Sequence, residues 1–307
     1  MGLPVAKDFC AQASSDLEEP IIGTAAARTS VWLGVEVRGV WPRDAFECDT
    51  VPPALRSRLP MWAAALPGFR PQALRRPGRE QCSEPAVFVA LTGPDCDTVV
   101  RLNVSSLETL SEIDLPSVVE TIRAGGVPDG GRRVEEPAVW VCVHGKRDRC
   151  CAKFGAPVFE AAAALEGVDV WQTSHLGGHR FAATLLCLPT GLCYGRVQAD
   201  DVDSLVRNHA QGRVHDLTLF RGRSCWSAPA QAAVHFVRAH VGEMATSGFV
   251  PTSEAETDDG VRVRVESPRG GFDVVVEKRP VGGEAPPSCE KPPAPVAGWF
   301  QVALRPI

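Results

Sequence analysis

The fold is decided by residues 139–197, which read VWVCVHGKRDRCCAKFGAPVFEAAAALEGVDVWQTSHLGGHRFAATLLCLPTGLCYGRV. The apolar run at 139–145 predicts a buried strand. Residues 151–167 are rich in alanine and predict a helix that ends at Gly167. Three further strands are expected at 168–175, 181–189 and 192–197.

The order of these elements selects one kind of sheet. Pro-Thr-Gly between the last two strands predicts a hairpin turn, and 199–212 predicts a closing helix with an acidic first turn. Strand, helix, three strands and helix is the order of a thioredoxin-like sheet. Parallel pairing and a right-handed crossover leave one natural arrangement of it.

Two short motifs stand at the ends of neighbouring strands in this block. They are Cys142-x8-Cys151 and His175-x3-His179. A strand–helix–strand unit returns the chain to the same edge of a sheet, so we expect both motifs to face one point. Thiolates and imidazoles are donors that iron–sulfur clusters and zinc accept, and a helix N-terminus at Cys151 would stabilise a thiolate. The sequence therefore predicts a metal centre of either kind.

The spacing of the histidines has a second reading, which the sequence argues against. H-x3-H is also the spacing of zinc proteases, but those require a Glu after the first His and a helix. Here Leu176 follows His175, and Gly177 and Gly178 disfavour a helix. The two glycines instead allow left-handed or tight backbone geometry, so both histidines can turn inward.

The chain before this block repeats its pattern weakly. Strands are expected at 31–37, 86–93 and 98–104, with helices at 53–66 and 115–126. This echo favours a first thioredoxin-like half without ligands, although alternating α/β proteins in general give similar patterns. The first twenty-odd residues predict a polar, weakly ordered lead-in.

The chain after this block predicts a small addition. Residues 227–242 predict an amphipathic helix, and 246–260 a polar, acidic linker. Short strands at 261–266, 272–278 and 299–304 predict a β-addition docked on one of the sheets. The expected division is 1–135 as an N-terminal α/β half without ligands, 136–245 as the thioredoxin-like domain with the metal centre, and 246–307 as linker and C-terminal β segment.

Composition limits the class of protein. Of 307 residues, 44% are hydrophobic and 22% charged, which is ordinary for a globular protein. With a net charge of −5 and no long basic stretch, we expect no nucleic-acid partner. We also expect no membrane segment and no signal peptide, because apolar runs are short and the first residues lack an apolar core. The expected location is cytoplasmic.

Eleven cysteines need a reason in a reducing compartment, where structural disulfides are uncommon. Most should be small buried hydrophobes, with a subset that binds metal. Cys187 and Cys193 flank the hairpin and are expected to pack. No defensible ligand spacing is found for Cys10, Cys48, Cys82, Cys96, Cys225 and Cys289.

Longer stretches resemble a known family. CVHGKRDRCCAKFGAP (142–157) and WQTSHLGGHRFAATLLCLPTG (171–191) resemble the sucrase/ferredoxin-like family, as do EPIIGTAAARTSVWLGVEV (19–37) and YGRV (194–197). Members with C-x8-C and H-x-G-G-H are thioredoxin-like ferredoxins with a bis-cysteine, bis-histidine [2Fe–2S] site. All-cysteine thioredoxin-like ferredoxins have C-x3-C where this chain has H-x3-H.

The resemblance implies a ligand set. Cys142 and Cys151 would hold the inner iron, and His175 and His179 the outer one. The alignment prefers Cys151 to Cys150, which is left buried or as a spare thiol. His144 is expected in a supporting or solvent-facing place. The basic residues near the motifs would favour reduction if they lie close: Lys146, Arg147, Arg149, Lys153 and Arg180.

The implied function is one-electron transfer with an unidentified redox partner protein, more a carrier than a catalyst. Neutral imidazoles make the cluster easier to reduce, as in Rieske centres at roughly −150 to +300 mV against about −400 mV for plant-type ferredoxins. A titratable ring nitrogen predicts proton-coupled reduction. The alternative is a structural Cys2His2 zinc site in a thioredoxin-like module. Sucrose hydrolysis is not expected, because no carboxylate pair is suitably placed.

Overall fold

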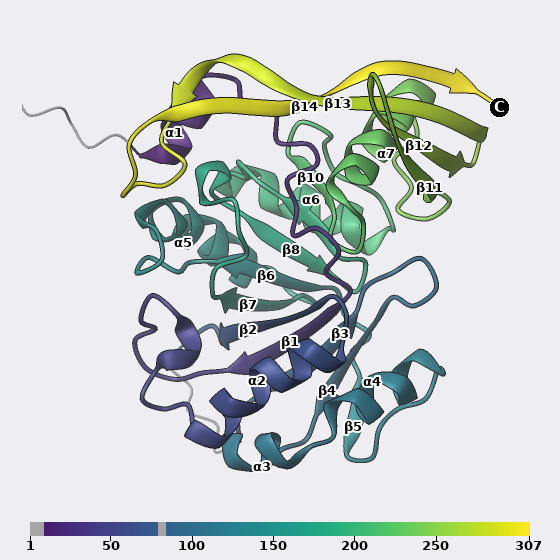
Figure 1. The fold of residues 1–307 in the computed structure, drawn as a ribbon. Coiled ribbons are helices and arrows are strands. Elements are labelled where there is room, and N and C mark those ends of the chain that lie inside the picture. Colours follow the sequence, from purple (N-terminus) through teal and green to yellow (C-terminus); the bar gives the residue numbers. More distant parts are fainter. Residues whose placement is uncertain (1–8, 79–83) are drawn as a thin grey trace, which may run out of the picture.

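The computed structural model describes residues 9–78 and 84–307, which form one large mixed sheet, a smaller antiparallel sheet and the helices that cover them (Figure 1). Within these residues the large sheet has ten strands in the order β10-β9-β8-β6-β7-β2-β1-β3-β4-β5. The predicted α/β fold class, with a thioredoxin-like ferredoxin arrangement and a C-terminal β-addition, is confirmed.

The second half of the large sheet consists of the predicted elements: β6 (Ala138–Cys142), α5 (Arg149–Ala163), β7 (Asp169–Thr173), β8 (Leu185–Leu188), β9 (Leu192–Tyr194) and α6 (Val202–Ala210). Strand β6 is central, parallel to β7 and antiparallel to β8, and β8 pairs with β9. This is the arrangement expected for a thioredoxin-like sheet. Short 3-10 turns η2 (His179–Phe181) and η3 (Ala199–Asp201) precede β8 and α6.

The first half repeats that topology with β1 (Val31–Glu36), α2 (Pro53–Ala65), β2 (Phe69–Arg75), β3 (Val87–Leu91), β4 (Thr98–Leu102) and α4 (Leu115–Arg123). Strand β1 is parallel to β2 and antiparallel to β3, and β3 pairs with β4. The expected second thioredoxin-like half is therefore present as a structural repeat. It also carries η1 (Ala45–Glu47), α3 (Leu107–Glu112) and β5 (Gly131–Arg133).

The two halves meet along a short antiparallel seam. Leu74 pairs with Thr173 and Arg75 with Gln172, which joins β2 to β7. Side chains of both halves share one core beside this seam. The ring centroid of Phe88 lies 6.4 Å from that of Trp140 and 5.3 Å from that of Trp171. Both tryptophans are buried, and the expected boundary near residue 135 stays a prediction.

The C-terminal sheet has the order β11-β12-β13-β14. Its strands are β11 (Val250–Thr257), β12 (Gly260–Ser267), β13 (Gly270–Ala285) and β14 (Ala294–Pro306). It packs its apolar face on helix α7 (Ala228–Val241), so the prediction that it docks on a sheet is wrong. The predicted linker at 246–260 is also wrong, because β11 forms there by backbone pairing with β12 while its side chains stay mostly exposed.

From residue 9 on, the N-terminal segment forms a helix and turns, which corrects the expected weakly ordered lead-in for that part; residues 1–8 lie outside the described residues. Helix α1 (Cys10–Asp16) buries Cys10 and Ala11, and it lies beside the near ends of β13 and β14 in Figure 1. The chain then runs along β10 (Phe220–Arg223) to reach β1. The N–H of Gly23 donates to the carbonyl of Arg221 at 2.9 Å.

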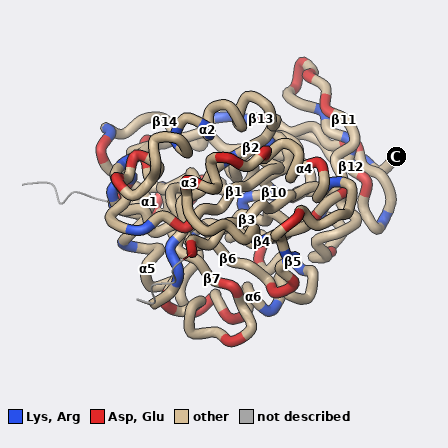
Figure 2. Tube along the Cα trace, turned by 90° about the horizontal axis from the view of Figure 1, so that it is seen from below, with Lys and Arg blue, Asp and Glu red and all other residues tan. Residues whose placement is uncertain are grey.

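Charged side chains are distributed over the described chain rather than sorted by sign. Figure 2 shows Lys and Arg interspersed with Asp and Glu around the fold. In the part of the chain that the structure describes, the helices are too short or too polar to cross a bilayer.

Candidate metal centre

Strand β6 and helix α5 place the two predicted cysteines. Cys142 is the last residue of β6, and Cys151 lies in the first turn of α5. Asp148 caps that helix, because its Oδ1 accepts from the N–H of Cys150 at 2.9 Å. Gly155 has no Cβ, so the second turn of α5 packs directly against the carbonyl of Cys142. Both thiols are buried at 1% exposure.

The loop after β7 places the two histidines. Gly177 and Gly178 have φ of +91° and +72°, the left-handed geometry that the sequence predicts. The chain turns back at these residues, and the rings of His175 and His179 meet edge to face with centroids 5.2 Å apart. Both imidazoles therefore lie on the side of the loop that faces α5.

Three of the four predicted ligands converge on one point. The donor atoms of Cys142, Cys151 and His175 lie within 4.8 Å of one another, and Sγ of Cys151 is 3.6 Å from Nδ1 of His175. His179 is outside this group: it lies against His175, with its Nδ1 2.9 Å from Oδ2 of Asp148. The joint role of all four as ligands stays a prediction.

The two thiols influence each other's ionisation in opposite directions. Hydrogen bonding with Cys151 is the largest cause that holds the pKa of Cys142 well below its usual value; burial opposes this, and His175 adds to it. The same hydrogen bond, followed by burial, raises the pKa of Cys151. Deprotonation is thus favoured at Cys142 over Cys151, and a thiolate is the form in which cysteine binds metal.

Two arginines from distant parts of the sequence supply positive charge. Arg70 donates from its guanidinium to the carbonyl of His175 at 3.0 Å, and Arg221 donates to the carbonyl of Gly177 at 3.1 Å. Burial lowers the pKa of Arg221 to about 10, so it remains charged at neutral pH. Sequence reasoning missed both arginines and favoured nearby ones; Arg180 instead pairs with Glu19 at 2.7 Å.

Asp148 lies behind the site and makes several polar contacts there. Its Oδ2 accepts from the N–H of Cys289 at 2.9 Å and lies beside His179. Burial opposes ionisation, but the contacts from His179, Cys289 and Cys150 outweigh it and hold the pKa of Asp148 well below its usual range. Asp148 is therefore a carboxylate that fixes the ring of His179.

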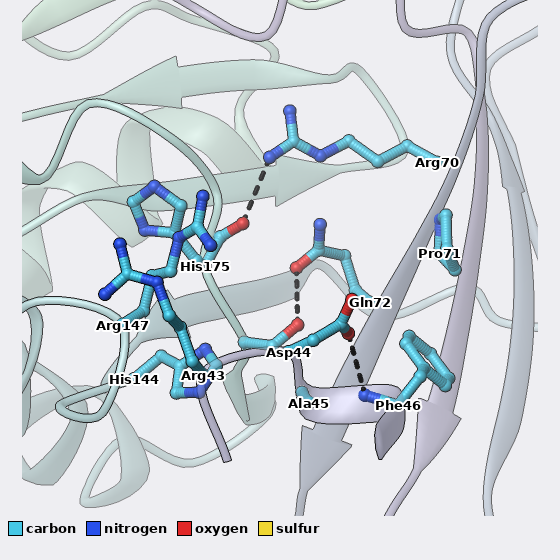
Figure 3. Close-up of a pocket in the computed structure, with 11 residues that line it drawn as sticks. Arg43, Asp44, Ala45, Phe46, Arg70, Pro71, Gln72, His144, Arg147 and His175 are labelled. Carbon is cyan, nitrogen blue, oxygen red and sulfur yellow. Dashed lines mark hydrogen bonds between the residues drawn. The ribbon is translucent and has the colours of Figure 1, made fainter. Parts of the chain in front are cut away.

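A hollow of about 320 Å³ opens beside His175 (Figure 3). Arg43, Arg70 and Arg147 line it with His144, so it is rich in positive charge. His144 was expected in a supporting or solvent-facing place, and it does not face solvent. The residue is 3% exposed, and its Nε2 lies 2.7 Å from the carbonyl oxygen of Pro42.

The remaining cysteines divide into two kinds. Cys187 and Cys193 are buried in cores, which confirms their predicted packing role. Cys10, Cys150 and Cys289 gather around Asp148, a grouping that no ligand spacing in the sequence indicated for Cys10 and Cys289. The Cys150-Cys151 doublet was the available signal. Among residues 9–78 and 84–307 no such group includes Cys48, Cys96 or Cys225, and Cys82 lies outside them.

Comparisons with known proteins give a family match. The profile of the family described as Suc_Fer-like, Sucrase/ferredoxin-like, matches residues 21–222. No curated protein matches the chain. Among solved structures, a variant of the thioredoxin-like [2Fe-2S] ferredoxin from Aquifex aeolicus is similar, at 22% identity and a TM-score of 0.24, over 27% of this chain and 96% of that one.

Proposed function

Because the chain belongs to the sucrase/ferredoxin-like family, we propose that Cys142, Cys151, His175 and His179 hold a [2Fe–2S] cluster and that the protein carries single electrons. The observation that carries this proposal is the convergence of two buried thiols and an imidazole on one point, with a second imidazole against the first. When bound, such a cluster supplies a one-electron couple.

The surrounding residues fit the donor set. A metal-binding histidine commonly directs its other ring nitrogen to a carboxylate, which fixes its orientation. Asp148 stands in that relation to Nδ1 of His179 and leaves Nε2 as the donor atom. The lowered pKa of Cys142 favours the thiolate that a metal binds, and Cys151 lies in the first turn of α5, where free backbone N–H groups favour negative charge.

Charge around the site favours the reduced form. Two thiolates and two neutral imidazoles leave an oxidised [2Fe–2S] site without net charge, and an added electron makes it negative. Arg70 and Arg221 donate hydrogen bonds to the loop that carries the histidines, and both interact electrostatically with Cys142. Their positive charge stabilises the reduced state and raises the potential.

We propose that the redox partner binds the face of the protein around His175. That side chain lines the hollow of Figure 3, so an electron has a short route from the site to a molecule seated there. Arg43 and Arg147 on the rim favour a partner with an acidic surface. This arrangement fits a carrier that meets another protein better than an enclosed catalytic chamber.

One observation favours the alternative of a structural zinc ion. Ligands on two different irons stand further apart than ligands on one ion, and Sγ of Cys151 is only 3.6 Å from Nδ1 of His175. A single tetrahedral Zn²⁺ accepts two thiolates and two imidazoles at such separations.

Anaerobic purification separates the two. The cluster predicts a red-brown protein with iron and acid-labile sulfide in equal amounts and a paramagnetic signal after reduction. A colourless protein with zinc at these four residues would replace the cluster with the structural ion. Cys142→Ser serves as the site control, because it must abolish the metal held at Cys142, Cys151, His175 and His179 while leaving any metal bound elsewhere in place.

A further inference from the structure

A second group of metal-binding side chains lies behind the first. Three thiols, from Cys10 of α1, Cys150 of α5 and Cys289 of the loop between β13 and β14, surround the carboxylate of Asp148. Their donor atoms all lie within 4.8 Å of one another. We propose that Cys10, Cys150, Cys289 and Asp148 bind a Zn²⁺ ion that fastens helix α1 and the β13–β14 loop to helix α5.

The sulfur separations fit a common centre. Cys10 and Cys150 are 3.4 Å apart at Sγ, Cys150 and Cys289 are 3.3 Å apart, and Cys289 and Cys10 are 3.7 Å apart. A tetrahedral zinc with bonds of about 2.3 Å to sulfur places two thiolates about 3.8 Å apart. A disulfide would join two of the sulfurs and leave the third, whereas here all three are nearly equidistant.

The fourth donor completes a zinc-type set. Oδ1 of Asp148 lies 3.8 Å from Sγ of Cys10. An ionised carboxylate accepts at about four positions, so Asp148 can serve a metal while it accepts from the N–H groups of Cys150 and Cys289. Three soft sulfurs with one carboxylate select zinc over magnesium or calcium, which require oxygen donors.

The surroundings are those of a built site rather than of chance neighbours. Cys10 and Cys150 are fully buried and Asp148 is 2% exposed, so the charge of the carboxylate and of any thiolate is out of water. A cation between them offsets that repulsion. The N–H of Ala11 points at Sγ of Cys150 from 3.4 Å, which is how backbone groups support metal-bound thiolates.

The short distances among these four donor atoms argue for one ion rather than a further iron–sulfur cluster, since a cluster spreads its ligands over several irons.

The ion would also connect distant parts of the chain. Cys10 and Cys289 are separated by 279 positions, and each belongs to a segment outside the large sheet. The ion would hold α1 and the β13–β14 loop against the first turn of α5, next to Cys151 and His179.

Metal analysis of the full chain tests this proposal. Wild-type protein and Cys289→Ser, Cys289→His and Cys225→Ser variants are purified anaerobically, and zinc and iron are measured by mass spectrometry. Cys289 is only partly buried, so its replacement is the mildest change, and Cys225 is a partly buried thiol outside both groups. We expect about one zinc per chain that Cys289→Ser loses and that Cys289→His and Cys225→Ser keep, because imidazole replaces thiolate at zinc but forms no disulfide.

The outcomes remain distinct from those of the proposed electron-transfer site. Iron content is unchanged in Cys289→Ser if the cluster is present, which also shows that the variant folds. If zinc fills both sites, the wild type holds about two ions and Cys289→Ser about one. Zinc content that does not respond to Cys289→Ser overturns the proposal, and so does a Cys10–Cys150 or Cys150–Cys289 disulfide in the metal-free wild type.

Discussion

The carbonyl oxygen of Cys142 lies against Gly155, so closely that a methyl group at position 155 would overlap it. This contact sets the distance between the end of β6 and helix α5, and hence between Cys142 and Cys151. Gly155→Ala must push the helix away. We expect a loss of about 1–3 kcal/mol in the free energy of unfolding, measured with urea, together with reduced metal content.

Gly93→Ala is the matched control for that change. A Cβ at Gly93 meets nothing within 4 Å, and its φ lies outside the left-handed range. Its unfolding free energy should stay within about 0.5 kcal/mol of wild type. Equal behaviour of the two alanine variants would show that the Cys142–Gly155 contact does not position the site.

Replacement of a histidine ligand should lower the reduction potential. His175→Cys and His179→Cys each exchange a neutral imidazole for a thiolate, which makes the site more negative. We expect each variant to keep a cluster and to shift by on the order of −100 mV or more in a redox titration. A reduced-state spectrum identical to that of wild type would exclude the substituted histidine as a ligand.

The potential should also depend on pH. An imidazole ligand carries a proton on its second nitrogen, and the oxidised site loses this proton more readily than the reduced site. Where the oxidised site has lost it, reduction takes up one proton and becomes harder as pH rises. The expected limit is a fall of about 59 mV per pH unit for one proton and one electron. The measurement is a titration from about pH 6 to 9, and a flat potential over that range would count against histidine ligation.

The buried pair of Glu36 and Arg76 in the first half should make stability depend on acid. Burial opposes ionisation of Glu36, but hydrogen bonds from Arg76 and from the N–H of Ala86 and the charge of Arg76 outweigh it and lower its pKa below the usual 4.5. This stabilisation is present above about pH 4.5 and is lost as pH falls through the lowered pKa.

Glu36→Gln should therefore cost about 2 kcal/mol of unfolding free energy at pH 7, because it removes the charge from the hydrogen bonds that Glu36 accepts from Arg76 and from the N–H of Ala86. The difference from wild type should shrink below about pH 4.5. Glu47→Gln is the control: Glu47 pairs with Arg56 at 3.5 Å on the surface and should cost less than about 1 kcal/mol. A pH-independent effect at Glu36 would refute the assignment.

The sequence predicts an element correctly where the residues of that element alone carry the pattern. Apolar runs identified β1, β6 and β7, and the glycines of H-L-G-G-H identified the turn that brings the histidines inward. Strand β2 gives no such signal, because FRPQALR contains Pro71 and two arginines and is positioned by its parallel neighbour β1. Strand β11 is exposed on most of its length and is held by backbone pairing alone.

Long-range groupings escaped prediction for the same reason. Arg70 and Arg221 reach the histidine loop from strands far away in the sequence, and Cys10 and Cys289 meet near opposite ends of the chain. Motif spacing reports only what one strand–helix–strand unit brings together. It placed Cys142, Cys151 and His175 at one point, but it carried no information on Asp148, whose role follows from the cap of α5.

The seam of two residue pairs between β2 and β7 affects whether the second half can be produced as a separate fragment. In a solitary thioredoxin-like unit β7 would be an outermost strand, and here the first half shields both its hydrogen-bonding edge and the indole rings of Trp140 and Trp171. A fragment that starts near residue 136 would present that edge and those rings to water, which is a template for self-association. The first half thus covers an edge and an aromatic surface of the second half that would otherwise favour self-association.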